Sequence, residues 1–135
     1  MEKYNTNLAA EFFVLSCLHR RGVTAALTLG NKKAVDILVA RDAGDSVTVE
    51  VKGVAKRYDW PADNIKPKNP ENHFVVLICF NGKIADPTMP SPEVWVVPFI
   101  ELRQFLKHYK GRTNVSRAKV KQLGKAYENA WDHIK

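Results

Sequence analysis

The sequence lacks several features, and each absence narrows the class of protein. The longest apolar run, FVVLICF from Phe74 to Phe80, is far too short to cross a bilayer, and the polar N-terminus MEKYNTN lacks the apolar core of a signal peptide. Low-complexity tracts and internal repeats are also missing, which argues against disorder and repeat folds. We therefore predict a soluble, cytoplasmic protein with no membrane partner.

Cysteine is equally scarce. Cys17 and Cys79 both fall within apolar segments and show no CxxC or Cys/His spacing. Such thiols more often serve as small buried hydrophobes than as ligands, so we expect neither zinc nor a disulfide. The chain also has no glycine-rich phosphate loop, nucleophile elbow or dinucleotide fingerprint, which argues against a small-molecule enzyme of the α/β type.

Positive charge is present in excess, and it is concentrated at one end. The net charge is +7, and the stretch from Arg103 to the C-terminus holds nine lysines and arginines against Glu128 and Asp132. A basic stripe beside a globular core is the usual electrostatic footprint of a polyanion binder. Charge alone does not decide the matter, because many basic proteins bind no nucleic acid.

The 135 residues fit one domain, 1–135, with a basic helical part at about 99–135. The order of elements is helix, three strands, a long loop, two strands and two helices. This order suits an α/β fold of three layers, α/β/α, with a central mixed five-stranded sheet and helices on both faces. The predicted helices cover 5–21, 99–108 and 116–134, and the predicted strands cover 23–30, 34–40, 47–53, 74–80 and 94–97, with a turn at Gly30 and Asn31.

Local signals set several of these boundaries. Asn5 or Thr6 can cap the first helix, and Gly22 can stop it. Pro98 suits the first turn of the second helix, and Ser116 can cap the last one.

The strand VTVEVKG, Val47 to Gly53, carries two charges among its valines. Side chains alternate along a strand, so the valines face one way while Glu50 and Lys52 share the other face. The preceding strand, AVDILVA, holds Asp36 between Val35 and Ile37, where a lone carboxylate is costly unless it is paired or bound to a cation. The two strands look like a hairpin across the turn RDAGDS, which would bring Asp36 close to Glu50 and Lys52.

Two carboxylates and an amine can hold a hard divalent cation. Magnesium takes one or two carboxylates and completes its octahedron with water and phosphate oxygens, so Asp36, Glu50 and the main-chain carbonyl of Val51 are candidate ligands. Mg²⁺, or Mn²⁺ in its place, would polarise a scissile phosphate, and Lys52 can orient a water or offset developing charge. The alternative is a Glu50–Lys52 surface pair with Asp36 at a strand edge.

The stretch VDILVARDAGDSVTVEVKG resembles the core of the PD-(D/E)XK nuclease superfamily, which has the restriction-endonuclease-like fold. The resemblance covers about residues 5–100, and Val35 stands where the motif name has proline. It implies that Asp36 and Glu50 bind magnesium and that Lys52 is the catalytic lysine. It also matches Glu11 to the glutamate that many members bring from the first helix, although Glu11 could simply belong to the polar face of that helix.

Candidate nucleic-acid contacts lie in the long loop 54–73 and at the C-terminus. A loop of this length in a compact domain is often functional, and aromatic and cationic side chains can stack on bases and bind phosphates. The alternatives are that Trp60 pins the loop to the core and that the C-terminal cations form a solvated helix face. The four histidines fall in no ligand or triad arrangement, and we expect surface or capping roles for them. The candidate contacts are Lys56, Arg57, Trp60, Arg112, Arg117, Lys119 and Lys121.

A magnesium-dependent DNA endonuclease is the function that explains both the acidic hairpin and the basic stripe. The runner-up is a catalytically lapsed nucleic-acid-binding domain of the same fold, serving in a larger defence or repair assembly. A small domain that cuts both strands of a duplex would most simply act as a symmetric homodimer.

Overall fold

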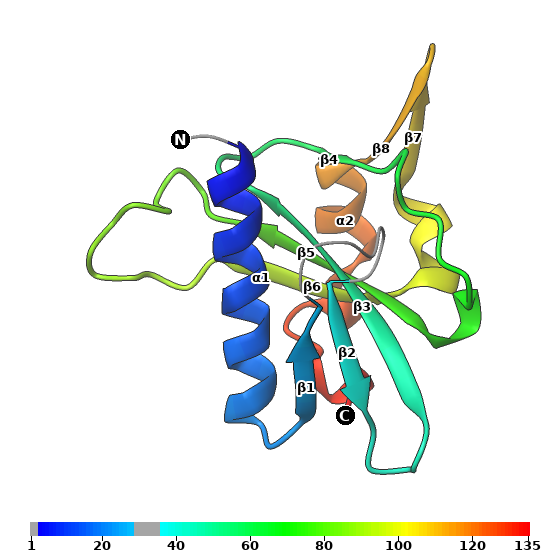
Figure 1. The fold of residues 1–135 in the computed structure, drawn as a ribbon. Coiled ribbons are helices and arrows are strands. Elements are labelled where there is room, and N and C mark those ends of the chain that lie inside the picture. The colour runs from blue at the N-terminus through cyan, green and yellow to red at the C-terminus, as the bar shows by residue number, and fades with distance from the viewer. Residues whose placement is uncertain (1–2, 29–35) are drawn as a thin grey trace.

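The computed structural model describes residues 3–28 and 36–135. At its centre is a mixed sheet in the order β1-β2-β3-β5-β6, in which β3 and β5 are parallel and the other neighbours are antiparallel (Figure 1). The predicted α/β class with a five-stranded mixed sheet is therefore confirmed. The strands are β1 (Thr24–Leu27), β2 (Ile37–Ala40), β3 (Ser46–Val54), β5 (His73–Cys79) and β6 (Glu93–Pro98).

Helix α1 (Lys3–Arg20) covers one face of this sheet. Its buried side chains, among them Val14 and Leu18, pack with the buried valines of β2 and β3. The helix ends as predicted, because Gly22 adopts a φ of +73°, which favours glycine. It already includes Lys3, so the predicted caps at Asn5 or Thr6 are wrong.

Gly53 lets α1 approach β3 closely. A Cβ atom at this position would lie 2.7 Å from the Cβ of Ala10, a distance that real contacts do not tolerate. The glycine after the Glu-x-Lys tripeptide is thus needed for helix–sheet packing. It brings the α1 turn that carries Glu11 against β3.

The opposite face of the sheet is covered by the C-terminal half of the chain. There the 3-10 helix η2 (Phe99–Phe105), helix α2 (Arg117–Leu123) and a second sheet pack on β5 and β6. The second sheet has the order β4-β8-β7 and draws its first strand from the long loop. Its strands are β4 (Trp60–Pro61), β8 (Arg112–Val115) and β7 (Leu106–Tyr109).

The C-terminal part differs from the prediction of two helices. The second predicted helix ends at Phe105, and the chain continues directly into β7. Ser116 caps α2 as predicted, its hydroxyl accepting from the N–H of Lys119, but α2 ends at Leu123. Gly124 then leaves helical geometry with φ −99° and ψ 15°. The remaining short 3-10 helices are η1 (Pro70–Asn72), η3 (Lys125–Tyr127) and η4 (Trp131–His133).

Because α2 is shorter than the predicted helix over 116–134, the set of buried apolar residues also differs from the prediction. On a continuous helix over 116–134, Leu123 and Trp131 would belong to one core-facing stripe, but Leu123 is 53% exposed. Trp131 and Ile134 are buried, and they reach the core through η4 and the residue after it.

Further expectations concern the two cysteines, membrane-spanning segments and the turn at Gly30. Cys17 and Cys79 are buried free thiols, as predicted. None of the described helices is long and apolar enough to cross a membrane. The turn at Gly30 and Asn31, the end of the first predicted strand and Val35 lie outside the described residues.

Candidate active site

The alternation of side chains on β3 is the base of the site. Val47, Val49 and Val51 belong to the core cluster shared with α1. Glu50 and Lys52 therefore point to the other face, as the sequence predicts. Glu50 is only 3% exposed, so its carboxylate cannot be an ordinary wet surface group.

Two side chains compensate the buried Glu50 carboxylate. The Lys52 Nζ lies 3.2 Å from Oε2, and the His73 Nε2 lies 3.1 Å from Oε1. A buried carboxylate without such partners would be strongly destabilising. Because a carboxylate has about four lone-pair sites, these two contacts leave acceptor capacity for a further ligand.

Asp36 lies where the ladder between β2 and β3 ends. Its Oδ2 accepts a 2.7 Å hydrogen bond from the N–H of Val51, and its own N–H donates to the Val49 carbonyl at 2.9 Å. The register pairs Ile37 with Val49, so Asp36 is the next residue along and lies beside Glu50. The described strand begins at Ile37, so the prediction of Asp36 inside the strand is wrong, although the predicted hairpin is confirmed.

The surroundings of Asp36 disfavour its negative charge. Burial raises the pKa of the Asp36 carboxyl, the hydrogen bond from Val51 opposes that shift, and the nearby charge of Glu50 adds to it. The charges of Lys52 and His73 lower the pKa, by smaller amounts. A divalent cation would relieve both the burial cost and the repulsion between the two carboxylates.

Glu11 reaches the same region from α1. Burial and the charge of Asp36 raise the pKa of the Glu11 carboxyl to about 7. Asp36 thus interacts electrostatically with one carboxylate from α1 and with one from β3. The structure thus sets Asp36 beside Glu50 and Lys52, and of these three residues Asp36 is the one that interacts with Glu11.

The donor set suits a partly hydrated hard cation. Backbone groups of alternate residues point to the same side of a strand, so the Val51 carbonyl points, like that of Val49, to the β2 side where Asp36 lies. Across residues 3–28 and 36–135, there is no cage of three or more His, Cys, Asp or Glu side chains that could hold a metal ion. Magnesium needs no such cage, because one or two carboxylates with waters and substrate oxygens suffice. Asp36, Glu50 and the Val51 carbonyl are therefore the groups that could supply ligands to such an ion.

His73 is the site residue that the sequence analysis missed. The expected surface or capping role is wrong for this histidine, which is 1% exposed at the start of β5. Parallel register sets it beside Thr48, whose Oγ1 lies 2.6 Å from Nδ1, while Nε2 meets Glu50. A histidine that opens an otherwise apolar strand was the available signal, but only the pairing of β3 with β5 gives it a partner.

The predicted contacts of the long loop divide into two groups. Lys56 and Arg57 are exposed, as a nucleic-acid contact requires. Trp60 is fully buried, its Nε1 donates to the Ile78 carbonyl at 3.0 Å, and its ring meets Trp95 edge-on. Trp60 therefore has no free ring face for a base. Its contacts match the alternative role, in which it pins the loop to the core.

The predicted C-terminal contacts divide in a similar way. Arg117 and Lys121 both bind Glu93, at 2.6 and 2.8 Å, and Lys119 Nζ donates to the Leu106 carbonyl at 2.8 Å. These cations are partly engaged within the protein. Arg112 instead lies exposed on the β7–β8 hairpin, with its guanidinium 5.1 Å from the centre of the Tyr109 ring.

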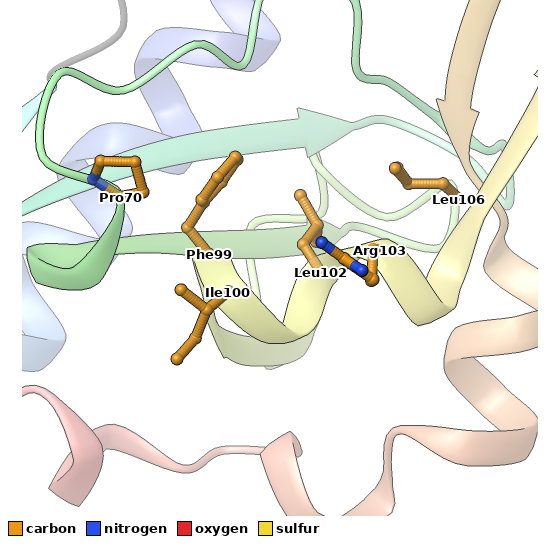
Figure 2. Close-up of a pocket in the computed structure, with 6 residues that line it drawn as sticks. All are labelled: Pro70, Phe99, Ile100, Leu102, Arg103 and Leu106. Atoms are coloured by element: carbon orange, nitrogen blue, oxygen red, sulfur yellow. The ribbon is translucent and has the colours of Figure 1, made fainter.

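An apolar pocket lies elsewhere, along η2. Figure 2 shows its lining, which contains no carboxylate. One wall residue, Phe99, meets the His73 ring edge-on at 6.0 Å. A lining without acidic or hydroxyl side chains offers no ligand to a hard metal ion. The candidate active site is therefore the one around β3, called the β3 site below, with Asp36, Glu50 and Lys52 and with Glu11 next to Asp36. The lining residues are Pro70, Phe99, Ile100, Leu102, Arg103 and Leu106.

Comparison with known proteins gives a structural match. The sequence matches no protein-family profile, and no curated protein matches it in sequence. The fold is similar to a solved structure described as a bacterial homing endonuclease, I-Ssp6803I, with a TM-score of 0.57 and 14% sequence identity. The match covers 98% of this chain and 91% of that chain. At this identity, the likeness shows a shared fold.

Proposed function

We propose that this chain is a magnesium-dependent DNA endonuclease, with Mn²⁺ able to replace Mg²⁺. The observation that carries the proposal is the convergence on β3, where Asp36 is hydrogen-bonded to Val51 beside the buried Glu50–Lys52 pair. The resemblance of these residues to the PD-(D/E)XK core and the fold shared with a homing endonuclease support it.

In this proposal, Asp36, Glu50 and the Val51 carbonyl hold the ion. Mg²⁺, when bound, supplies Lewis-acid polarisation of the scissile phosphate and activation of a water. Lys52, held 3.2 Å from Glu50, orients the water and offsets the charge that develops on the phosphate. Glu11 adds a further carboxylate next to Asp36.

His73 positions Glu50 rather than touching the substrate. It holds Glu50 Oε1 from the buried side, and Thr48 fixes its ring through the other nitrogen. Partners of this kind orient metal ligands, and their loss typically weakens metal binding or activity by roughly 10- to 100-fold.

DNA cleavage tests the proposal directly. Purified protein is incubated with supercoiled plasmid, branched DNA and RNA, with Mg²⁺, with Mn²⁺ and with EDTA. We expect metal-dependent cleavage of DNA by the wild type, none by Asp36→Asn, and wild-type activity in Asp42→Asn, the same substitution in the exposed β2–β3 turn.

The other outcomes identify the alternatives. Salt-sensitive DNA binding without cleavage, equal in the wild type and Asp36→Asn, would indicate the lapsed binding domain. Cleavage that survives Asp36→Asn would show that another site or a contaminant is responsible. Sedimentation of the protein with and without duplex DNA would test the homodimer that would most simply cut both strands.

A further inference from the structure

The β7–β8 hairpin extends beyond the body of the protein (Figure 1). Its strands are joined by a two-residue turn in which Gly111 has a φ of +82°. Residues 107–112 are all exposed. At its base, β8 pairs with β4, and the Asp63 carboxylate accepts from the N–H of Thr113 at 2.8 Å. The ribbon is thus anchored at one end, and its tip is free.

The hairpin carries positive charge without acidic residues. Lys107, Lys110 and Arg112 lie in it, and no Asp or Glu occurs anywhere between Leu102 and Tyr127. The nearest described carboxylate contact is that of Asp63 at the base. Glu93 engages Arg117 and Lys121, whereas no ion pair with a carboxylate is found for Lys107, Lys110 or Arg112 among the described residues.

One face of the ribbon carries two cations, a tyrosine and an asparagine. The register pairs Lys107 with Asn114 and Tyr109 with Arg112, and alternation along each strand sets all four on the same face. Lys107 and Arg112 lie over the Tyr109 ring at 5.4 and 5.1 Å. This stacking restrains two long cationic side chains before any partner binds, which lowers the entropy lost on binding.

The opposite face is different in character. There His108 and Thr113 contact each other, with 3.1 Å between Nδ1 and Oγ1. The two faces of one ribbon therefore offer an internal control.

We propose that the β7–β8 ribbon enters the major groove of duplex DNA and reads base edges with Arg112 and Asn114, while Lys107 binds the phosphate backbone. The groove is about 12 Å wide and admits a two-stranded β-ribbon. Arginine pairs with guanine and asparagine with adenine through two hydrogen bonds each, so these side chains suit base readout. This inference rests on the proposed function in taking DNA as the partner.

Selection from a pool of random-sequence duplex DNA, carried out in EDTA, tests the ribbon without cleavage. We expect the wild type to enrich a sequence motif and to prefer the selected duplex over a scrambled one. Arg112→Lys keeps the charge but loses the planar fork, and Asn114→Ala changes no charge. Each should lower that preference by roughly 5-fold or more while leaving binding to scrambled DNA within about 2-fold.

His108→Ala, on the opposite face, is the matched control and should keep the full preference. Thermal melts of every variant show whether the fold is retained. Methylation of guanine N7 within the motif should weaken the wild type and not Arg112→Lys, because N7 lies in the major groove. If the ribbon contacted only phosphates, neither Arg112→Lys nor Asn114→Ala would lower the preference for the selected duplex in this way.

Three results would overturn the ribbon proposal: no enriched motif, unchanged preference in both variants, or enrichment of RNA over duplex DNA in a parallel selection. The endonuclease proposal fails separately. If enrichment of the motif depends on Arg112 but no metal supports cleavage, the ribbon proposal is retained and the endonuclease proposal is rejected. If cleavage depends on Asp36 but enrichment of the motif depends on neither Arg112 nor Asn114, the endonuclease proposal is retained and the ribbon proposal is rejected.

Discussion

The site on β3 and the β7–β8 ribbon hold charge in opposite ways. Glu50 is buried, and its partners Lys52 and His73 come from the same sheet. On the ribbon, Lys107 and Arg112 are exposed and stack on a tyrosine instead of meeting a carboxylate. Buried charges need internal partners, whereas exposed cations stay available for an external polyanion.

In the proposed function, this difference separates chemistry from recognition. Glu50 and Lys52 lie on β3, a central strand of the main sheet, and small displacements of catalytic groups lower a reaction rate. Residues of the ribbon sit on a thin projection with few internal contacts. Substitutions in the site should therefore lower the cleavage rate, and substitutions in the ribbon should change which DNA is bound.

Lys52→Met should give the largest effect. We expect the single-turnover cleavage rate to fall by roughly 10²- to 10³-fold, because the ammonium that offsets developing charge is lost. DNA affinity measured in EDTA should change little. Lys83→Met, an exposed lysine outside the candidate site and the candidate DNA contacts, is the control and should keep the cleavage rate. A binding defect without a rate defect in Lys52→Met would move Lys52 from chemistry to recognition.

His73→Leu should lower cleavage by roughly 10- to 100-fold and raise the Mn²⁺ concentration needed for half-maximal rate. The cause is the loss of the donor that orients Glu50 Oε1. His73→Gln keeps an N–H donor of similar reach and should recover part of both losses. A purely structural role predicts lower thermal stability with an unchanged metal requirement, and that pattern would contradict the positioning role.

Gly53→Ala should destabilise the protein by about 1–3 kcal/mol, because the new methyl group overlaps the Ala10 Cβ. Urea unfolding gives the change in the free energy of unfolding. The double variant Gly53→Ala with Ala10→Gly removes the overlap and should be more stable than the sum of the single effects predicts. If the two single effects simply add in the double variant, the helix lies farther from β3 than the 2.7 Å between the Ala10 Cβ and a Cβ at position 53 implies.

Glu11→Gln should give the smallest effect and one that depends on pH. The Glu11 pKa is raised from its ordinary 4.5 to about 7, so between these values the folded protein keeps a proton that the unfolded chain has lost. Stability therefore falls as pH rises through this window and levels off above it. Since Glu11 is partly exposed, we expect Glu11→Gln to gain only about 1 kcal/mol, or roughly 3 °C in melting temperature, at pH 8 in EDTA.

The matched control for this experiment is Glu71→Gln, an exposed glutamate on η1. The gain in stability of Glu11→Gln should vanish below about pH 4.5, where Glu11 is protonated in both the folded and the unfolded wild type. An equal gain at every pH would assign it to helix propensity instead of charge.

Local patterns in the sequence predict much of the candidate site. The alternation in β3 and the hairpin with β2 follow from them, and the structure sets Asp36 close to Glu50 and Lys52. Glu11 was matched through the motif, and it interacts with Asp36. His73 escaped because its partner Thr48 comes from a parallel strand 25 residues away, and no local pattern encodes that pairing.

The C-terminal region was harder to predict. Apolar spacing from Val120 to Ile134 favours one helix, but Gly124 leaves helical geometry and Asn129 adopts a φ of +52°, so short turns bury Trp131 instead. The segment after Phe105 pairs as β7 with β8 because Ser116 and Val115 return alongside it. Tertiary pairing overrides helical periodicity here, and the ribbon that results was not expected from the sequence.

Calorimetric titration of Mn²⁺ into the metal-free protein measures binding at the proposed ion site without DNA. We expect heat of binding in the wild type that is lost in both Asp36→Asn and Glu50→Gln and retained in Asp42→Asn. Wild-type protein that takes up no Mn²⁺, or uptake that survives both site substitutions, would contradict it.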